Sequence, residues 1–176
     1  MFVSMFSIAL IFLAVLTVII YAIRYGIGPT PTSSEVRKSL YEVMPRKLSS
    51  GTIYELGAGW GNLLFRLGDR YPNHSVVGIE VSPLPWLWTY VRNRTRFSSN
   101  VCVVRGDFFQ ADLSDATLVV CYLYPAAMER LAERFVSELK PGTIIITHTF
   151  RLPGWTPIST IHAQDLYRTP VYVYIR

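Results

Sequence analysis

Hydrophobic and polar positions follow two different periods along residues 49–176. Short apolar runs predict buried strands, and between them apolar residues recur every three or four positions, as on one face of a helix. Five strands are predicted from the runs at 52–56, 75–80, 101–104, 116–122 and 143–147. Helices are predicted between them, beginning near Gly61, Ser82 and Pro125.

Strands that alternate with helices indicate an α/β fold, with a mostly parallel sheet covered on both faces. The last two apolar runs, 157–161 and 171–175, have no helix between them and predict a closing antiparallel pair. Ahead of the domain at 49–176, residues 24–48 form a connector rich in Gly and Pro and a short helix that Ser33 or Ser34 caps.

Residues 1–23 contain no charged side chain. A helix needs about 20 apolar residues to cross a bilayer. No Lys or Arg precedes Arg24 and no good cleavage site follows, so the segment predicts an uncleaved transmembrane helix rather than a signal peptide. The basic residues that follow it place the domain in the cytoplasm by the positive-inside rule. We therefore expect a single-pass membrane protein with its catalytic domain facing the cytoplasm.

The most informative segment is YELGAGWG at residues 54–61, a buried strand that runs into three alternating glycines. Its spacing differs from the G-x-G-x-x-G that cradles a pyrophosphate. Glu55 stands two residues before the first glycine, where a carboxylate repels a pyrophosphate but suits a cation. The next strand ends in Glu80, placed to accept hydrogen bonds from a ribose. S-adenosyl-L-methionine fits this pattern, since it carries a ribose, an ammonium and a sulfonium but no phosphate.

Further candidates follow the later strands. Asp107 could accept a hydrogen bond from an adenine amino group and Phe108 could stack on the ring, with an ordinary turn or helix-cap aspartate as the less favoured alternative for Asp107. Tyr122 and Tyr124 follow the fourth strand and either line a site or pack. His148 follows the fifth and is expected to be a structural histidine.

Together these features resemble the class I, seven-stranded S-adenosylmethionine-dependent methyltransferases, whose sheet is Rossmann-like with an antiparallel last strand. The matching residues are ELGAGWG at 55–61, Glu80, Gly106-Asp107 and the final antiparallel pair. Over residues 29–156 the chain looks like the small lysine methyltransferases, whose members include archaeal enzymes and mitochondrial enzymes acting on the adenine nucleotide translocase and the ATP synthase c-subunit. The segments that carry this closer likeness are PTPT at 29–32, GIEVSP at 78–83, VVCYLYP at 119–125 and HTFRLPGW at 148–155.

The resemblance implies how the cofactor is held. Glu55, Gly57 and Gly59 would hold its aminoacid end, with Glu80 on the ribose, Asp107 by the adenine and Thr30 in a lid. The full cofactor-binding set that we predict is Thr30, Glu55, Gly57, Gly59, Gly61, Asn62, Glu80, Asp107 and Phe108. The chain departs from its relatives at Ala58 and Trp60, and at Thr149, where many relatives have an acid.

The predicted activity is transfer of a methyl group to a lysine of a protein, with Tyr122, Tyr124 and Trp155 walling the acceptor channel. An anchored enzyme would favour a membrane protein as substrate. A small-molecule or phospholipid methyltransferase, or a non-catalytic cofactor-binding module, stays open as an alternative. The motif with which amino-methylating DNA enzymes follow the fourth strand is missing, which argues against nucleic acid as substrate.

Net charge and reactive side chains add little. The chain carries a net charge of +5, and the basic run from Arg92 to Arg105 is either a solvated helix end or a lipid contact. Cys102 and Cys121 lie inside apolar runs and are predicted to be buried, reduced thiols. No metal site is predicted, because the histidines and cysteines lack ligand spacing.

Overall fold

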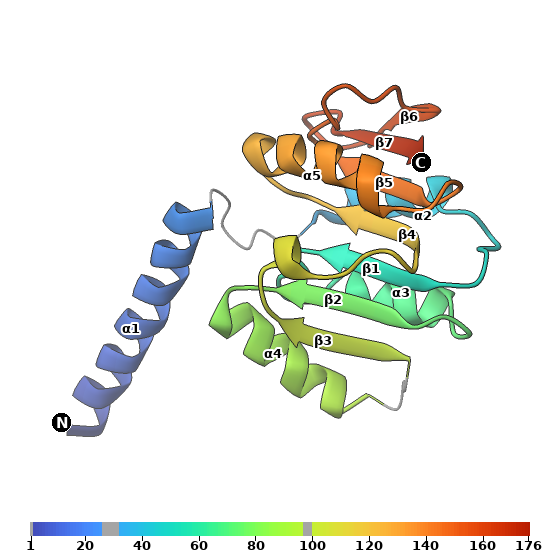
Figure 1. Cartoon of the computed structure of the whole chain (residues 1–176). Helices are drawn as coiled ribbons and strands as arrows, with labels where there is room; N and C mark the ends of the chain where they lie inside the picture. Colours follow the sequence, from blue (N-terminus) through green and yellow to red (C-terminus); the bar gives the residue numbers. More distant parts are fainter. Residues whose placement is uncertain (1, 26–31, 97–99) are drawn as a thin grey trace.

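A single seven-stranded sheet organises residues 49–176 (Figure 1). The computed structural model describes residues 2–25, 32–96 and 100–176. The strands lie in the order β3-β2-β1-β4-β5-β7-β6. The first five pair in parallel, whereas β7 runs antiparallel to both β5 and β6, which confirms the predicted mixed sheet. The strands are β1 Thr52–Leu56, β2 Val76–Glu80, β3 Val101–Arg105, β4 Ala116–Cys121, β5 Ile144–His148, β6 Ser159–His162 and β7 Pro170–Ile175.

The helices cover both faces of this sheet, as the alternating pattern predicted (Figure 1). The helices over the sheet are α2 Ser34–Val43, α3 Leu64–Arg70, α4 Pro83–Arg94 and α5 Pro125–Glu138, with a 3₁₀ turn η1 at Phe108–Gln110, whereas α1 Phe2–Tyr25 lies apart from the sheet (Figure 1). The leading helix α2 begins where expected, because the Ser33 side chain accepts a hydrogen bond from the Val36 N–H at 3.3 Å. Pro125 opens α5, where its missing N–H leaves no helical bond unmade.

Strand β4 shows how one strand serves two cores. Leu118 and Val120 pack in the core under α2 and α3, while Val119 and Cys121 pack in the core under α5. This period of two is what a strand with both faces covered requires. Every residue of β4 is buried and all but Thr117 are apolar, so the strand reads as a nearly continuous apolar run in the sequence.

Strand β3 lies at an edge of the sheet, and one of its faces has no helix over it. The connection from β3 to β4 contains only η1 and no α-helix. Val101 and Val103 are therefore buried, whereas Cys102 and Val104 on the opposite face are exposed. The expectation that both cysteines are buried holds for Cys121 and is wrong for Cys102.

The N-terminal segment requires a correction. α1 occupies Phe2–Tyr25, but in the part of the chain that the structure describes no helix combines the length and apolarity that a membrane crossing demands. This finding contradicts the transmembrane anchor predicted at 1–23, and with it the single-pass membrane localisation and the cytoplasmic orientation. The prediction rested on composition, the lack of charge together with many apolar side chains, and composition alone does not establish a helix that meets the demands of a membrane crossing.

Candidate active site

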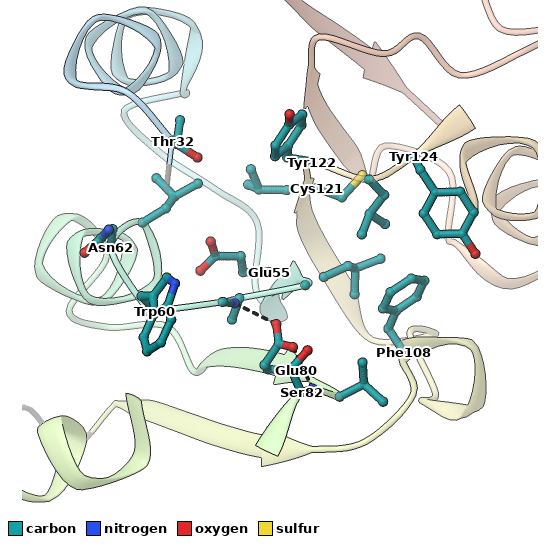
Figure 2. Close-up of a pocket in the computed structure, with 18 of the residues that line it drawn as sticks. Thr32, Glu55, Trp60, Asn62, Glu80, Ser82, Phe108, Cys121, Tyr122 and Tyr124 are labelled. Carbon is teal, nitrogen blue, oxygen red and sulfur yellow. Dashed lines mark hydrogen bonds between the residues drawn. The ribbon is translucent and has the colours of Figure 1, made fainter. Parts of the chain in front are cut away.

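The candidate site lies at the carboxyl ends of the parallel strands, beside the point where the strand order reverses. Chain connections from β1 lead to β2 on one side, whereas β4 leads to β5 on the other. Loops after adjacent strands diverge at such a point and leave a crevice. Here the crevice is a cavity of about 260 Å³. Its lining is Thr32, Glu55, Leu56, Gly57, Ala58, Gly59, Trp60, Asn62, Leu63, Glu80, Val81, Ser82, Asp107, Phe108, Phe109, Val120, Cys121, Tyr122, Leu123, Tyr124, Arg130 and His148 (Figure 2).

The glycine loop after β1 is held in place by its neighbour strand. The N–H groups of Gly57 and Ala58 both donate to the Ile79 carbonyl, at 2.9 and 3.0 Å. Gly57, Gly59 and Gly61 have φ values of 76°, 52° and 73°, a left-handed conformation that favours glycine. The loop therefore cannot continue into a helix at Gly61, and α3 begins three residues later than predicted, at Leu64.

Gly59 and Gly61 differ in what surrounds them. A Cβ at Gly59 would meet no heavy atom within 4 Å, so this position faces open space beside the cavity. A Cβ at Gly61 would come within 2.6 Å of Thr89 and 2.8 Å of Phe65. Gly61 does not belong to the cavity lining given above, and its absent side chain instead lets the loop pack against α3 and α4.

Glu80 connects the ends of β1, β2 and the start of α4. One carboxylate oxygen accepts a hydrogen bond from the Gly59 N–H at 2.8 Å, and the other accepts from the Ser82 N–H at 2.7 Å. The residue is buried apart from the face that lines the cavity. A carboxylate has about four lone-pair directions, so this arrangement leaves acceptor capacity for the hydroxyl groups of a ligand.

Glu55 is the least satisfied acid of the site. It is 7% exposed, and its Oε2 atom has no hydrogen-bond partner. Burial, and then the nearby charge of Glu80, raise the pKa of the Glu55 carboxyl well above its usual range. Figure 2 shows the Glu55 and Glu80 side chains projecting into the same cavity from neighbouring strands. An unpaired buried acid is costly, so a cationic ligand group beside Glu55 would be stabilised there.

Asp107 and Phe108 form the far wall of the cavity. An Asp107 oxygen caps η1 by accepting a hydrogen bond from the Phe109 N–H at 2.9 Å, which is the cap role that the sequence left open. The Arg130 guanidinium lies 3.7 Å from the centre of the Phe109 ring, and Arg134 donates to the Phe108 carbonyl at 2.7 Å. Helix α5 thus fixes an aromatic surface at this end of the cavity, where a flat ligand ring could stack.

Tyr122 and Tyr124 line the cavity from the end of β4. The Tyr122 ring stacks on the His148 ring, with centroids 4.4 Å apart and planes 16° from parallel. Trp155 lies elsewhere: its indole N–H donates to the Ala132 carbonyl at 3.1 Å, and its ring packs edge-on to Tyr174. The structure therefore places both tyrosines in the cavity lining and Trp155 against α5, outside that lining.

Two predicted residues, Asn62 and Thr30, remain to be placed. Asn62 lines the cavity, and Thr30 lies outside the described residues. Several lining residues were not predicted as site residues, and those with polar or aromatic side chains of most interest are Thr32, Trp60, Arg130 and His148. Trp60 could have been included from its place inside the glycine motif, whereas nothing local in the sequence places α5 Arg130 over a loop 20 residues earlier.

The residues that line the cavity fit a ligand with a cationic end, a sugar and a flat ring. Glu55 suits an ammonium, Glu80 suits sugar hydroxyls, and Phe108 offers a ring surface, all within one cavity. Among the described residues no group of three His, Cys, Asp or Glu side chains could hold a metal ion.

Comparison with known proteins gives consistent matches. Residues 55–159 match the family of the ANTKMT methyltransferase domain. A protein-lysine N-methyltransferase of Saccharolobus islandicus is 29% identical over 148 residues, which cover 82% of this chain and 91% of that protein. The adenine nucleotide translocase lysine N-methyltransferase of Mus musculus is 27% identical over 114 residues, covering 63% of this chain. The matched part is 48% of that mouse protein, about half its length.

Among solved structures, an RNA methyltransferase from Salinibacter ruber in complex with S-adenosyl-L-homocysteine superimposes with a TM-score of 0.69 and 28% identity. The match covers 83% of this chain and 93% of that one.

Proposed function

The chain belongs to the family of ANTKMT methyltransferase domains, and from that premise we propose that it transfers a methyl group from S-adenosyl-L-methionine to the ε-amine of a protein lysine. The family match begins at Glu55 and therefore includes the glycine loop, Glu80, Asp107 and both tyrosines. Relatives described as lysine N-methyltransferases support the choice of acceptor. The observation that carries the proposal is the pair of buried acids, Glu55 and Glu80, facing one cavity.

The cofactor would lie along the cavity from Glu55 to Phe108. The unpartnered Glu55 oxygen suits its ammonium group, and the open space at Gly59 lets it approach the main chain. Glu80 has acceptor capacity left for ribose hydroxyls, and Phe108 would stack on the adenine near Asp107. When bound, S-adenosyl-L-methionine supplies a sulfonium methyl, and the C–S electron pair stays on sulfur as the amine nitrogen bonds to the methyl carbon.

The acceptor amine must reach the cavity uncharged, and the reference pKa of lysine is about 10.4. Cys121, Tyr122, Leu123 and Tyr124 give this part of the wall an apolar and aromatic character. Such a wall disfavours the ammonium form and lowers the pKa of an entering amine. A strong base is then unnecessary, and the main task of these residues is alignment of the amine with the methyl carbon.

We assign the two tyrosines to the channel wall and give Trp155 an indirect part. Its indole holds the loop after β5 against α5 through the bond to Ala132. Residues 24–48 act as a connector and leading helix for the domain at 49–176, and they contribute Thr32 to the cavity.

The proposal is tested by incubating the full chain with radiolabelled S-adenosyl-L-methionine and a cell extract from a strain that lacks the gene. Protein, RNA and lipid are then separated, and labelled protein is digested for mass spectrometry. We expect label on lysine, lost in Glu80→Ala and Gly57→Arg and retained in Glu129→Ala, which removes an exposed acid on α5.

Each other fraction has its own meaning. Label confined to RNA would favour an activity like that of the Salinibacter ruber relative, and label confined to lipid or small molecules would favour the alternative acceptors. Cofactor binding without label in any fraction would indicate a binding module. All three outcomes contradict the proposed lysine transfer.

A further inference from the structure

His148 is buried in the wall of the cavity at the end of β5, next to Tyr122. It is 4% exposed and lines the cavity together with Thr32 and Tyr122. Its ring stacks on Tyr122, and the Tyr122 ring in turn lies nearly parallel to Phe150, at 7° and 6.3 Å between centroids. The imidazole is thus held in one plane by an aromatic stack that spans the ends of two neighbouring strands.

The two ring nitrogens of His148 have different surroundings. Nδ1 lies 3.2 Å from the hydroxyl of Thr149, and Nε2 lies 3.5 Å from the hydroxyl of Thr32. Thr149 has a φ of 68°, a left-handed conformation that is rare for a threonine and marks a position where surrounding structure enforces the geometry. Nδ1–H can donate to Thr149, which leaves the lone pair of Nε2 on the cavity side with only a long contact to Thr32.

This nitrogen is an acceptor and not a base for an amine. Burial lowers the pKa of His148 to about 4, so the ring is neutral at physiological pH. A lysine ammonium, whose reference pKa is about 10.4, will not transfer its proton to so weak a base. A neutral lone pair in a buried wall can still accept a hydrogen bond, and an incoming N–H at a normal distance can replace the 3.5 Å contact with Thr32.

We propose that His148 Nε2 accepts a hydrogen bond from an N–H of the acceptor amine, which turns the amine lone pair toward the methyl carbon and favours the first and second methyl transfers over a third. The inference rests on the proposed function and deepens it, because it concerns how many methyl groups the site adds. His148 is then a substrate-binding residue of the acceptor side, beside the tyrosine wall.

The dependence on methylation state follows from counting hydrogens. A neutral primary amine has two N–H groups and a monomethylated amine has one, so each can donate to His148 and still direct its lone pair at the methyl carbon. A neutral dimethylated amine has no N–H left. His148 therefore stabilises the first two transfers and gives no help to the third.

The test uses the full chain, radiolabelled S-adenosyl-L-methionine and two forms of one gene-deleted cell extract. One form is native, and in the other the amines have been exhaustively dimethylated with formaldehyde and a borane. The variants are His148→Ala, which removes the hydrogen-bond acceptor, and His148→Gln, whose side-chain oxygen places an acceptor near the position of the wild-type Nε2 atom. His162→Ala, at an exposed histidine of β6, is the control. Calorimetric affinity for S-adenosyl-L-methionine identifies variants that fold.

We expect His148→Ala to label native lysines about tenfold more slowly, the loss that one hydrogen bond of about 1–1.5 kcal/mol predicts. Its labelling of the dimethylated extract should equal that of the wild type, and His148→Gln should recover a large part of the native rate. If the wild type adds no third methyl, the recovery by glutamine decides alone.

Three results overturn the inference. An equal loss on both extracts identifies His148 as merely structural, an unchanged rate on native lysines removes its role, and a failure of glutamine to recover any rate excludes an acceptor function. A wild type that labels no lysine in the native extract overturns the proposed function itself, and the inference with it.

Discussion

The carboxylate of Glu80 accepts a hydrogen bond of 2.8 Å from the backbone N–H of Gly59, 21 residues earlier in the chain. This bond joins the acid that ends β2 to the glycine loop after β1, so the two motifs that stand apart in the sequence form one structure. The second oxygen of Glu80 binds the Ser82 N–H at 2.7 Å and fixes the start of α4. Glu80 therefore shapes the glycine loop as well as lining the cavity.

Glu80→Gln should lower the affinity for S-adenosyl-L-methionine by tenfold to a hundredfold. The glutamine amide keeps one oxygen but places an NH₂ group against a backbone donor, and hydrogen bonds to a charged group contribute about 1.5–3 kcal/mol. Isothermal titration calorimetry measures the loss, with Glu129→Gln on α5 as the control. An affinity equal to that of the wild type would remove Glu80 from the cofactor site.

Gly59→Ala should weaken cofactor binding more than it weakens the fold. Gly59 and Gly142 both have positive φ, and an added Cβ meets nothing at either position, so the strain in both variants is about 1–2 kcal/mol. Gly59 borders the cavity and Gly142 does not. Calorimetry and thermal unfolding of the two variants should therefore agree in stability and differ in affinity. Equal affinities would place the cofactor away from Gly59.

Gly61→Ala should have the opposite effect and destabilise the domain by about 2–4 kcal/mol. Its added methyl group meets Thr89 at 2.6 Å and Phe65 at 2.8 Å, in addition to the left-handed strain. Urea unfolding gives the change in the free energy of unfolding, and Gly142→Ala provides the reference for strain alone. A loss no larger than that of Gly142→Ala would mean that α3 and α4 yield easily around the loop.

Trp155→Ala should lower the free energy of unfolding by about 3 kcal/mol, because the Trp155 ring packs against α5 and its N–H donates to the Ala132 carbonyl.

Tyr124→Phe should leave the melting temperature unchanged and slow methyl transfer, since Tyr124 lines the cavity. Thermal unfolding and initial rates separate the two variants. Full activity in Tyr124→Phe would contradict our assignment of Tyr124 to the acceptor channel, and an unchanged melting temperature in Trp155→Ala would contradict a structural role for Trp155.

Stability should fall with acidification in a way that His148 controls. Burial lowers the pKa of His148 from 6.5 to about 4, so between these values the unfolded chain binds a proton that the folded chain excludes. The free energy of unfolding is therefore unaffected by this group above pH 6.5 and declines by about 3 kcal/mol as the pH falls to 4. Glu55 has a raised pKa and opposes this trend.

The contribution of His148 is isolated by comparing pH slopes. His148→Gln should flatten the decline between pH 6.5 and 4 in urea titrations, whereas His162→Gln should follow the wild type. Parallel slopes for all three proteins would mean that water reaches the His148 ring in the folded state.

The sequence by itself determined the sheet and the cofactor end of the site. β4 reads as a strand because all its residues are buried, and the Gly57–Gly61 loop is visible because positive φ restricts the residue type. Glu55 and Glu80 could be found for a similar reason: each stands at a strand end, and parallel strand ends share one edge of a sheet. These are local constraints, and one-dimensional patterns record them.

Only the tertiary structure decided what lies across that edge. His148 and Thr32 are 116 residues apart, and Arg130 reaches the loop after β3 from a helix that follows β4. Trp155 packs against α5 outside the cavity lining, and Cys102 is exposed because no helix covers one face of the edge strand. The apolar composition of residues 1–23 likewise predicted a membrane span that the described helices do not supply. Contacts between distant segments depend on how helices and strands pack against one another, and a local pattern of residues does not specify that packing.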